Sequence, residues 1–290
     1  MIDFWTYTCI NCIRTLPYLV DWHEKYSDKG LVIIGVHTPE FEFEKKYENV
    51  KMAVEKYGIK YAVVQDNDYT TWTAFRNRYW PRKYLIDKDG FIRYDHIGEG
   101  AYAETENKIQ ELLLEAGMNP DEKPSIDIQV PDLSKLKQLA ITSELYAGYD
   151  FALPRSQDIG NREGLQPEKI IDYSPSGKIS KNIIYLEGKW KSNPDNLETA
   201  ENAKIILDFT ASEVNIVAGK VEKELKLEVL INERFISKEQ AGADVEFENG
   251  KSFVLIKEPR LYNLVDGDYG NYKLTLRAEK GFSFNAFTFG

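Results

Sequence analysis

The chain has 290 residues, of which 42% are hydrophobic and 29% are charged, which is typical of a globular chain long enough for about two domains. It has 37 basic and 47 acidic residues, and the net charge of −10 argues against nucleic acid or anionic lipid as the main partner. No run of about 18 apolar residues occurs, and two cysteines are too few for a disulfide-stapled scaffold or a four-cysteine zinc site.

The chain opens on a short apolar segment, Ile2–Trp5, that is typical of a strand running into a loop. Strands usually have about five or six residues, so we expect that residues upstream of Met1 are missing. The alternative is that a short strand suffices. No secretory signal precedes the segment. If residues upstream of Met1 are missing, the lack of a signal in this sequence says little about where the protein is located.

Residues 1–117 alternate strand-like and helix-like segments. Apolar runs predict strands at 2–5, 31–36, 61–64, 82–86 and 91–96. Amphipathic patterns predict helices at 14–26, 44–57, 69–77 and 102–115. Asp87–Gly90 has the composition of a hairpin turn. This order of elements predicts an α/β sandwich around a mixed sheet.

The pattern changes after residue 117. Residues 118–142 are rich in turn-forming and polar residues and are predicted to be a linker. From 143 to 290, helical periodicity nearly disappears. Short apolar or alternating runs predict strands at 203–209, 214–217, 225–231, 245–247, 253–256, 272–276 and 282–289. Their spacing predicts an all-β sandwich or jelly roll.

Cys9 and Cys12 lie between a strand end and a helix start. A thiol at a helix N-terminus faces unpaired N–H groups and the positive end of the dipole, which favour a thiolate. This spacing lets one sulfur attack a substrate disulfide and the other release the product. A stabilising disulfide is the less favoured alternative, because so short a loop contributes little chain entropy. A second alternative is that the two cysteines are half of the ligands of a zinc site, but the sequence has no second cysteine pair to complete the site.

Further residues suit this chemistry. Asp3 lies six residues before Cys9, on the strand predicted to run beneath the helix, where burial would raise its pKa and let it exchange a proton with Cys12. Pro17 is placed within the helix. Pro81 precedes an apolar strand, where a cis proline can hold the backbone near the sulfurs.

These spacings resemble the thioredoxin superfamily. The resemblance implies that Cys9 is the nucleophile, that Cys12 is the resolving thiol and that Asp3 is the buried acid–base group. It also implies that Pro81, preceded by Trp80, is the cis proline of the substrate groove.

Three longer segments, Asp3–Pro17, Gly35–Phe41 and Asn77–Pro81, narrow the resemblance to DipZ-type thioredoxin-like proteins. Residues 44–57 resemble the helical insertion of the TlpA and ResA group. In that group a glutamate after the second strand approaches the cysteines, and the resemblance implies this role for Glu40.

The C-terminal half resembles the module that follows the thioredoxin domain in DipZ, a carbohydrate-binding-module-like β-sandwich, at residues 143–149 and 287–290. The resemblance implies an extracytoplasmic enzyme, in the periplasm or at the cell surface, that reduces disulfides of protein substrates. It implies no metal and no cofactor beyond the Cys9–Cys12 disulfide. DipZ proteins carry a membrane electron-delivery domain of the CcdA type ahead of this region. The 290 residues do not include such a domain. Whether a separate membrane protein of the CcdA type supplies the electrons is therefore an open question.

Without the resemblance, the residues are also compatible with other functions. Thr6–Cys9 matches the Thr-x-x-Cys fragment of peroxiredoxins, although Ile2 stands where those enzymes have proline. His37 and the cysteines could mimic copper-delivery proteins of this fold, but those space their cysteines wider, so we expect a packing role for His37. A third alternative is a glycan- or partner-binding β-sandwich with a redox-inactive thioredoxin-like support. Its aromatic candidates, which more often belong to a core, are Tyr146, Tyr149, Trp190, Tyr262 and Tyr272.

Overall fold

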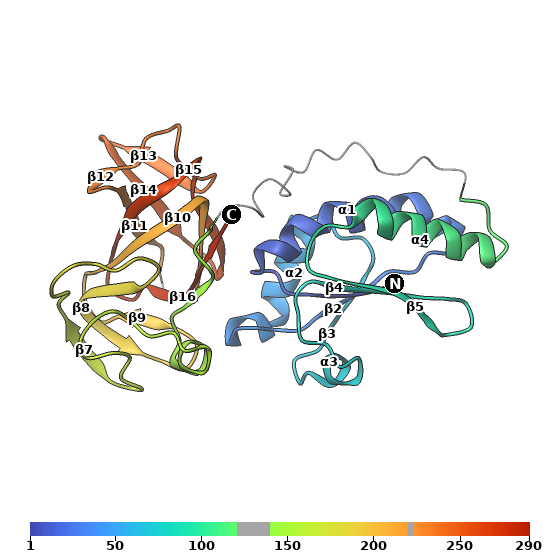
Figure 1. Cartoon of the computed structure of the whole chain (residues 1–290), viewed down its shortest axis with the longest axis horizontal. Coiled ribbons are helices and arrows are strands. Elements are labelled where there is room, and N and C mark those ends of the chain that lie inside the picture. Colours follow the sequence, from blue (N-terminus) through green and yellow to red (C-terminus); the bar gives the residue numbers. More distant parts are fainter. Residues whose placement is uncertain (121–139, 220–222) are drawn as a thin grey trace. The chain divides into compact units, whose positions relative to one another are not determined.

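The computed structural model describes residues 1–120, 140–219 and 223–290, and the chain divides into two compact units, Met1–Pro131 and Asp132–Gly290 (Figure 1). The predicted linker, residues 118–142, lies mostly outside the described residues. Within the described ranges, none of the helices combines the length and the apolar character that a membrane span requires.

A five-stranded mixed sheet forms the centre of the N-terminal unit, in the order β3-β2-β1-β4-β5. Its strands are β1 (Ile2–Trp5), β2 (Ile34–His37), β3 (Ala62–Gln65), β4 (Arg82–Ile86) and β5 (Ile92–Ile97). The central β1 pairs in parallel with β2 and antiparallel with β4. The predicted α/β arrangement around a mixed sheet is therefore confirmed.

Helices cover both faces of this sheet. They are α1 (Ile10–Tyr26), α2 (Tyr47–Lys56), α3 (Thr70–Ala74) and α4 (Tyr102–Glu115), with short 3-10 turns at Ser27–Lys29 and Glu42–Lys45. Helices α1 and α4 lie on one face and α3 on the other (Figure 1). The predicted helix 44–57 begins only at Tyr47, because Lys46 has an extended backbone with φ −78° and ψ 123°.

The two faces bury different side chains because successive residues of β1 point to opposite sides. Phe4 points to the α3 face, and its ring packs edge-on against those of Trp72, Phe75 and Tyr84. Asp3 and Trp5 point to the face covered by α1. Both are 1% exposed or less, so a carboxyl group lies inside the unit and away from solvent.

Gly35 of β2 lies opposite Asp3 in the parallel pairing. A Cβ atom at this position would come within 3.0 Å of the Trp5 indole nitrogen and 3.2 Å of the Tyr61 ring. Contacts this short require the neighbours to move. Glycine therefore allows both aromatic side chains to pack close to the buried carboxyl group.

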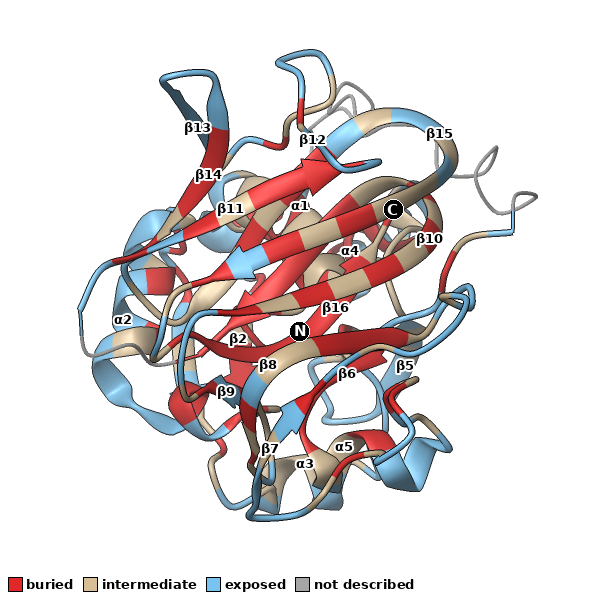
Figure 2. Ribbon diagram, turned by 90° about the vertical axis from the view of Figure 1, so that its left-hand side faces the viewer, coloured by how far each residue is buried: buried red, intermediate tan, exposed pale blue. Residues whose placement is uncertain are grey.

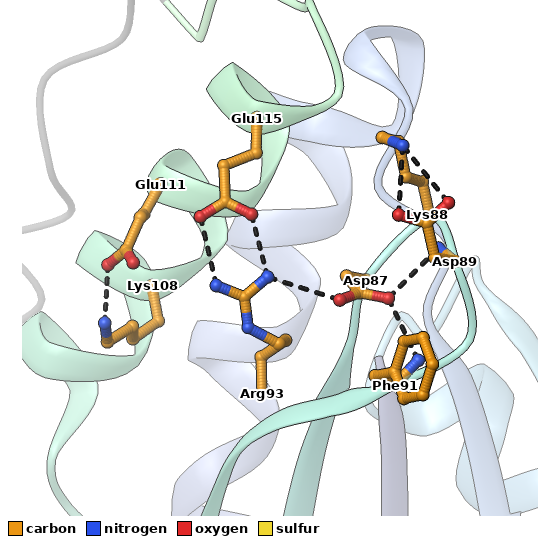
Figure 3. A network of polar contacts seen from close by, with 8 residues as sticks. All are labelled: Asp87, Lys88, Asp89, Phe91, Arg93, Lys108, Glu111 and Glu115. Carbon is orange, nitrogen blue, oxygen red and sulfur yellow. Dashed lines mark hydrogen bonds and ion pairs between the residues drawn. The ribbon is translucent and has the colours of Figure 1, made fainter.

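An ion-pair network joins the β4–β5 hairpin to the end of α4 (Figure 3). The Arg93 guanidinium donates to both oxygens of Glu115, at 2.8 and 3.1 Å, and to Asp87 at 3.2 Å. Asp87 also accepts the backbone N–H groups of Asp89 and Phe91, at 3.0 and 2.9 Å, which closes the predicted hairpin turn. Because solvent screens these groups, the network orients α4 more than it stabilises the fold.

The C-terminal unit is almost entirely β-structure. Among the described residues of this unit, the helical part is α5 (Tyr149–Ala152) followed by a 3-10 turn at Leu153–Arg155. Its strands are β6 (Leu145–Tyr146), β7 (Ile170–Tyr173), β8 (Ile184–Ser192), β9 (Leu197–Thr199), β10 (Ala203–Ala218), β11 (Leu225–Ile231), β12 (Arg234–Phe235), β13 (Val245–Glu248), β14 (Lys251–Ile256), β15 (Arg260–Ala278) and β16 (Ser283–Phe289). The all-β prediction for this half is confirmed.

Nine of these strands pair in the order β13-β14-β11-β15-β10-β16-β9-β8-β7, while β12 pairs with β11 and β6 pairs with β16. Strand β10 pairs with β8 through residues 204–207 and with β16 through residues 214–218, while β9 pairs with both β8 and β16. These four strands thus form a closed circuit. Burial alternates along residues 203–211 of β10, so one side of this part of the strand faces the core, whereas residues 214–218 are buried on both sides (Figure 2).

Several predicted strand boundaries in this half were wrong. The predicted strands 203–209 and 214–217 are one strand, β10, which continues through register shifts near Ala211 and Val214. Strand β15 begins at Arg260 rather than at residue 272. Strands β7, β8 and β9 were not predicted. In β8, charged residues and Gly188 with φ +87° interrupt the apolar pattern.

Candidate active site

The two cysteines lie where β1 ends and α1 begins. Cys9 is the N-cap of α1, with φ −77° and ψ 114°, and its Sγ accepts the backbone N–H of Cys12 at 3.4 Å. Cys9 is half-buried, Cys12 is 1% exposed, and both are free thiols in this structure. Cys9 is therefore the sulfur that a second molecule can reach, at the positive end of the α1 dipole.

Cys12 is the buried member of the pair. Burial raises the pKa of its thiol well above the usual value, and the hydrogen bond and charge of Cys9 raise it further. Asp3 adds to the rise, while a backbone hydrogen bond with Thr6 opposes it. Cys12 is thus held as a neutral thiol, and it needs a base before it can act as a nucleophile.

The carboxyl group of Asp3 has a pKa that suits it to accept a proton near neutral pH. Neither of its oxygens has a hydrogen-bond partner in the structure. Burial raises the pKa of Asp3 from 3.8 to about 7, and the positive charge of Lys83 limits the rise. A group that titrates near neutral pH can both accept and return a proton there. The charge of Asp3 also raises the pKa of the Cys12 thiol, so the protonation states of the two groups influence each other.

Lys83 is a component of the site that the sequence analysis missed. It lies directly opposite Asp3 in the antiparallel pairing of β1 with β4, and it is 0% exposed. Its Nζ lies 3.4 Å from the Gly98 carbonyl oxygen and 5.7 Å from the centre of the Tyr102 ring. Burial lowers the pKa of Lys83, while the negative charges of Asp3 and Cys12 raise it. The buried lysine thus balances the charge that forms at the site.

Replacing Lys83 with methionine is expected to raise the pKa of Asp3 above its value of about 7, because the variant loses the positive charge that lowers it. A neighbouring opposite charge is worth about one pKa unit or more. Carbon-13 NMR titration of the Asp3 carboxyl group measures the shift. Lys88→Met, the same change at an exposed hairpin position, should leave the titration unchanged. An unaltered midpoint in the Lys83 variant would show that the two side chains do not interact.

Glu40, the glutamate predicted to approach the cysteines, lies half-exposed in the loop after β2. Its backbone N–H donates to Oε2 of Glu44 at 2.6 Å. The buried carboxylate of this loop belongs to Glu44, which is 0% exposed and whose Oε1 accepts the Thr8 hydroxyl at 2.5 Å. Glu44, which the sequence analysis did not single out, thus contacts the residue before Cys9. The role of Glu40 stays a prediction.

Trp80 and Pro81 lie at the same edge of the sheet as Cys9. The bond between them is cis, and β4 begins at the next residue, with Arg82 opposite Phe4 of β1. Because the two strands are antiparallel, Pro81 lies beside the end of β1 that leads to Cys9. The topology therefore brings these two predicted groove residues to the thiol pair.

Both halves of the chain match families of known proteins. The family described as thioredoxin like C-terminal domain matches residues 142–290, about half of the chain, and the AhpC/TSA family matches residues 1–95. Protein DipZ of Mycobacterium bovis is 39% identical over 224 residues, which cover 76% of this chain and 31% of DipZ. The chain belongs to the DipZ-type thioredoxin-like family. It spans about a third of the length of that relative.

Other similarities fall on a smaller part of this DipZ-type chain. Thiol-disulfide oxidoreductase YkuV of Bacillus subtilis is 28% identical over 115 residues, which cover 40% of this chain and 77% of YkuV. The crystal structure of a thiol-disulfide isomerase from Corynebacterium glutamicum has 20% identity and a TM-score of 0.36, and covers 39% of this chain and 78% of that one. The DipZ match, at 76% of the chain, is longer than the N-terminal unit and so includes residues of both units.

His37 has a packing role in this DipZ-type domain. Its ring stacks on Tyr7 at 5.7 Å and meets Trp5 edge-on at 5.3 Å. Burial lowers the pKa of His37 to about 3, so the imidazole is neutral at physiological pH. Its Nε2 lies 3.3 Å from the Thr6 hydroxyl oxygen. The histidine therefore helps to hold the loop before Cys9.

Two of the surface hollows in the described part of the C-terminal unit have volumes of about 310 and 400 Å³. The larger is lined by charged side chains of β8, β10, β11 and β15 and by no aromatic ring. Trp190 and Tyr262 are 0% exposed and belong to the core, so neither can stack on a sugar. Tyr146 is 8% exposed and lines the smaller hollow. The burial of Trp190 and Tyr262 weakens the case for an aromatic sugar platform.

Proposed function

We propose that the N-terminal unit is a thiol–disulfide oxidoreductase that reduces disulfides of protein substrates outside the cytoplasm. The unequal burial of the pair carries the proposal: Cys9 is reachable at a helix N-cap, and Cys12 lies buried beside Asp3. The similarity to YkuV, which is named a thiol-disulfide oxidoreductase, supports the same class of reaction. No cofactor is required in this proposal beyond the Cys9–Cys12 disulfide.

The first step is the attack of the Cys9 thiolate on one sulfur of a substrate disulfide. The substrate S–S bond breaks, a mixed disulfide forms at Cys9, and the other substrate sulfur leaves as a thiolate that takes a proton from solvent. The N–H groups at the start of α1 stabilise negative charge on Cys9 before the attack. The half-exposed position of Cys9 admits the substrate.

The second step releases the product. Asp3 accepts the proton of Cys12, and the Cys12 thiolate attacks Sγ of Cys9. The mixed disulfide breaks, the Cys9–Cys12 disulfide forms, and the second substrate thiolate takes a proton from Asp3 or from solvent. The substrate has gained two electrons and the pair has lost two. A membrane donor of the CcdA type would return them, and Glu40 would assist proton movement.

Trp80 and Pro81 are proposed to contact the substrate chain. The Trp80 indole N–H donates to the Thr38 carbonyl at 3.1 Å, and its ring lies 4.3 Å from that of Trp72. These contacts fix the position of the Trp80 ring at the edge of the sheet where β1 ends and the chain continues to Cys9. The β-rich unit is proposed to bind a cell-surface glycan or a protein partner.

A thiol peroxidase is the second candidate, and the match of residues 1–95 to the AhpC/TSA family favours it. In such an enzyme a threonine before the cysteine positions the peroxide. Here the Thr6 hydroxyl oxygen lies 3.3 Å from Nε2 of His37, so it is already engaged away from the thiol. Turnover of hydrogen peroxide with dithiothreitol as reductant tests this candidate directly.

The reduction potential of the Cys9–Cys12 pair tests the proposed function. It is measured by equilibration in dithiothreitol or glutathione buffers, followed by trapping of free thiols. A potential near or below about −250 mV is expected for a reductant, whereas one above about −180 mV would indicate an oxidant or an isomerase. A pair that does not cycle at all would contradict the oxidoreductase assignment and direct attention to the β-rich unit.

A further inference from the structure

Glu44 is a fully buried carboxylate of the N-terminal unit, and it bridges two loops. Its Oε1 accepts the Thr8 hydroxyl at 2.5 Å, from the loop that leads to Cys9. Its Oε2 accepts the backbone N–H groups of Glu40 and Phe41, at 2.6 and 2.9 Å, from the loop after β2. The carboxylate therefore connects the loop of the nucleophile to the neighbouring loop.

The groups that hydrogen-bond to the Glu44 carboxylate are donors. Besides the Thr8 hydroxyl and the two backbone N–H groups, the Thr6 hydroxyl also lowers the pKa of this carboxylate. The neutral His37 ring can then donate from Nε2 to the Thr6 oxygen, 3.3 Å away, a tautomer assigned from this network. A protonated acid would point its own hydrogen at a donor. Although burial raises the pKa of Glu44, this donor set suits the ionised form.

We propose that Glu44 is a positioning residue whose buried negative charge, held against the Thr8 hydroxyl, makes the Cys9–Cys12 pair a stronger reductant. This inference rests on the proposed oxidoreductase function. Thr8 directly precedes Cys9, and Glu44 is fully shielded from solvent, so little water screens the charge. A negative charge raises the free energy of the reduced form when that form carries a thiolate. It leaves the neutral disulfide unaffected, so the reduction potential falls.

Other charged groups near Glu44 are unchanged by its replacement. The phenol of Tyr69 lies close to the carboxylates of Glu40, Glu42 and Asp66 as well as Glu44, and burial together with these charges raises its pKa to about 12. His37 is neutral above pH 3. Neither Tyr69 nor His37 changes its charge between pH 7 and pH 9, so neither group accounts for a shift measured at pH 8.5.

The test compares equilibrium constants of the full chain with dithiothreitol at pH 8.5, where a free thiol is about half ionised. Glu44→Gln is expected to shift the constant about fivefold toward the dithiol, which corresponds to about 20 mV. Glu106→Gln is the matched control. Glu106 is 1% exposed and accepts the Tyr26 hydroxyl at 2.9 Å, near the opposite end of α1 from the cysteines, so its removal should leave the constant unchanged.

The variant Thr8→Val distinguishes the effect of the Glu44 charge from the effect of the hydrogen bond between Thr8 and Glu44. This variant keeps the carboxylate but removes the hydroxyl dipole that partly neutralises it, so the constant should shift about twofold toward the disulfide, opposite to Glu44→Gln. If Glu44 acted only as a structural tie, both variants would break the same contact and shift the constant in the same direction, which would overturn the inference. The Thr8 variant alone decides the matter if Glu44→Gln does not fold.

The wild-type measurement keeps the two proposals apart. A wild-type pair that never equilibrates with dithiothreitol would contradict the oxidoreductase function itself. A wild-type pair that cycles normally, with a Glu44→Gln constant equal to that of the wild type, would leave the function intact and remove Glu44 from the control of the potential.

Discussion

Cys9→Ser is expected to lower the rate of insulin reduction by at least about 1000-fold. A hydroxyl group ionises far less readily than a thiol, and an oxygen at this position cannot form a disulfide with a substrate. The helix N-terminus that favours a thiolate does not compensate for this change. The turbidity of precipitating insulin, followed with dithiothreitol as the reductant, measures the effect.

Cys12→Ser is the matched variant, and it should fail in a different way. Attack by Cys9 still occurs because Cys9 remains accessible at the N-cap of α1, but nothing resolves the mixed disulfide. The variant should therefore accumulate covalently bound substrate, visible on a non-reducing gel, which Cys9→Ser should not. Capture by Cys9→Ser and not by Cys12→Ser would reverse the two assigned roles.

The spacing of apolar residues correctly predicted those helices and strands whose apolar pattern is regular from end to end. The helix Tyr102–Glu115 and the strands Arg82–Ile86 and Leu225–Ile231 are confirmed at both ends. The predicted start of the first helix at residue 14 was wrong, because the helix begins at Ile10. Its first turn is capped by Cys9, and a cysteine side chain that accepts an N–H is not part of the usual capping signal.

The missed site residues depend on pairing between distant segments. A lysine on a strand usually faces solvent, and only the β1–β4 register places Lys83 opposite Asp3. Glu44 follows two other glutamates, at positions 40 and 42, that alternate with phenylalanines. Which of the three is buried depends on the 3-10 turn at Glu42–Lys45, which no periodicity predicts. Spacing alone did identify Asp3, because its distance from Cys9 is local.

Asp3→Asn is expected to slow release of the mixed disulfide about 100-fold at pH 7. An amide cannot accept the Cys12 proton, and burial holds that thiol in its neutral form. The wild-type rate should rise as pH increases through about 7, because Asp3 must lose its proton to act as a base. The variant should lack this inflection. Stopped-flow measurement of product release over pH 5–9 tests both statements, with Glu106→Gln as the control for loss of a buried carboxylate.

The same substitution should stabilise the fold at alkaline pH. The pKa of Asp3 is about 7 in the folded state and 3.8 in a solvated chain, so the folded state holds more protons between these values. The contribution of Asp3 to stability is then fully present below about pH 4 and is lost as pH rises through about 7. A difference of about three units corresponds to about 4 kcal/mol. Asp3→Asn avoids this loss, so its stability relative to the wild type should increase by up to about 4 kcal/mol between pH 4 and pH 8.

Urea unfolding followed by tryptophan fluorescence measures this gain. Trp5, Trp22, Trp72 and Trp80 lie in the N-terminal unit, and the remaining tryptophan, Trp190, lies in the other, so the signal reports mainly on the unit that contains Asp3. A variant that is slower in the second step yet more stable at pH 8 would show that the buried carboxyl group is kept for chemistry at a cost in stability. Equal pH dependence of stability in the two proteins would show instead that Asp3 does not titrate near neutral pH, and would exclude it as the base.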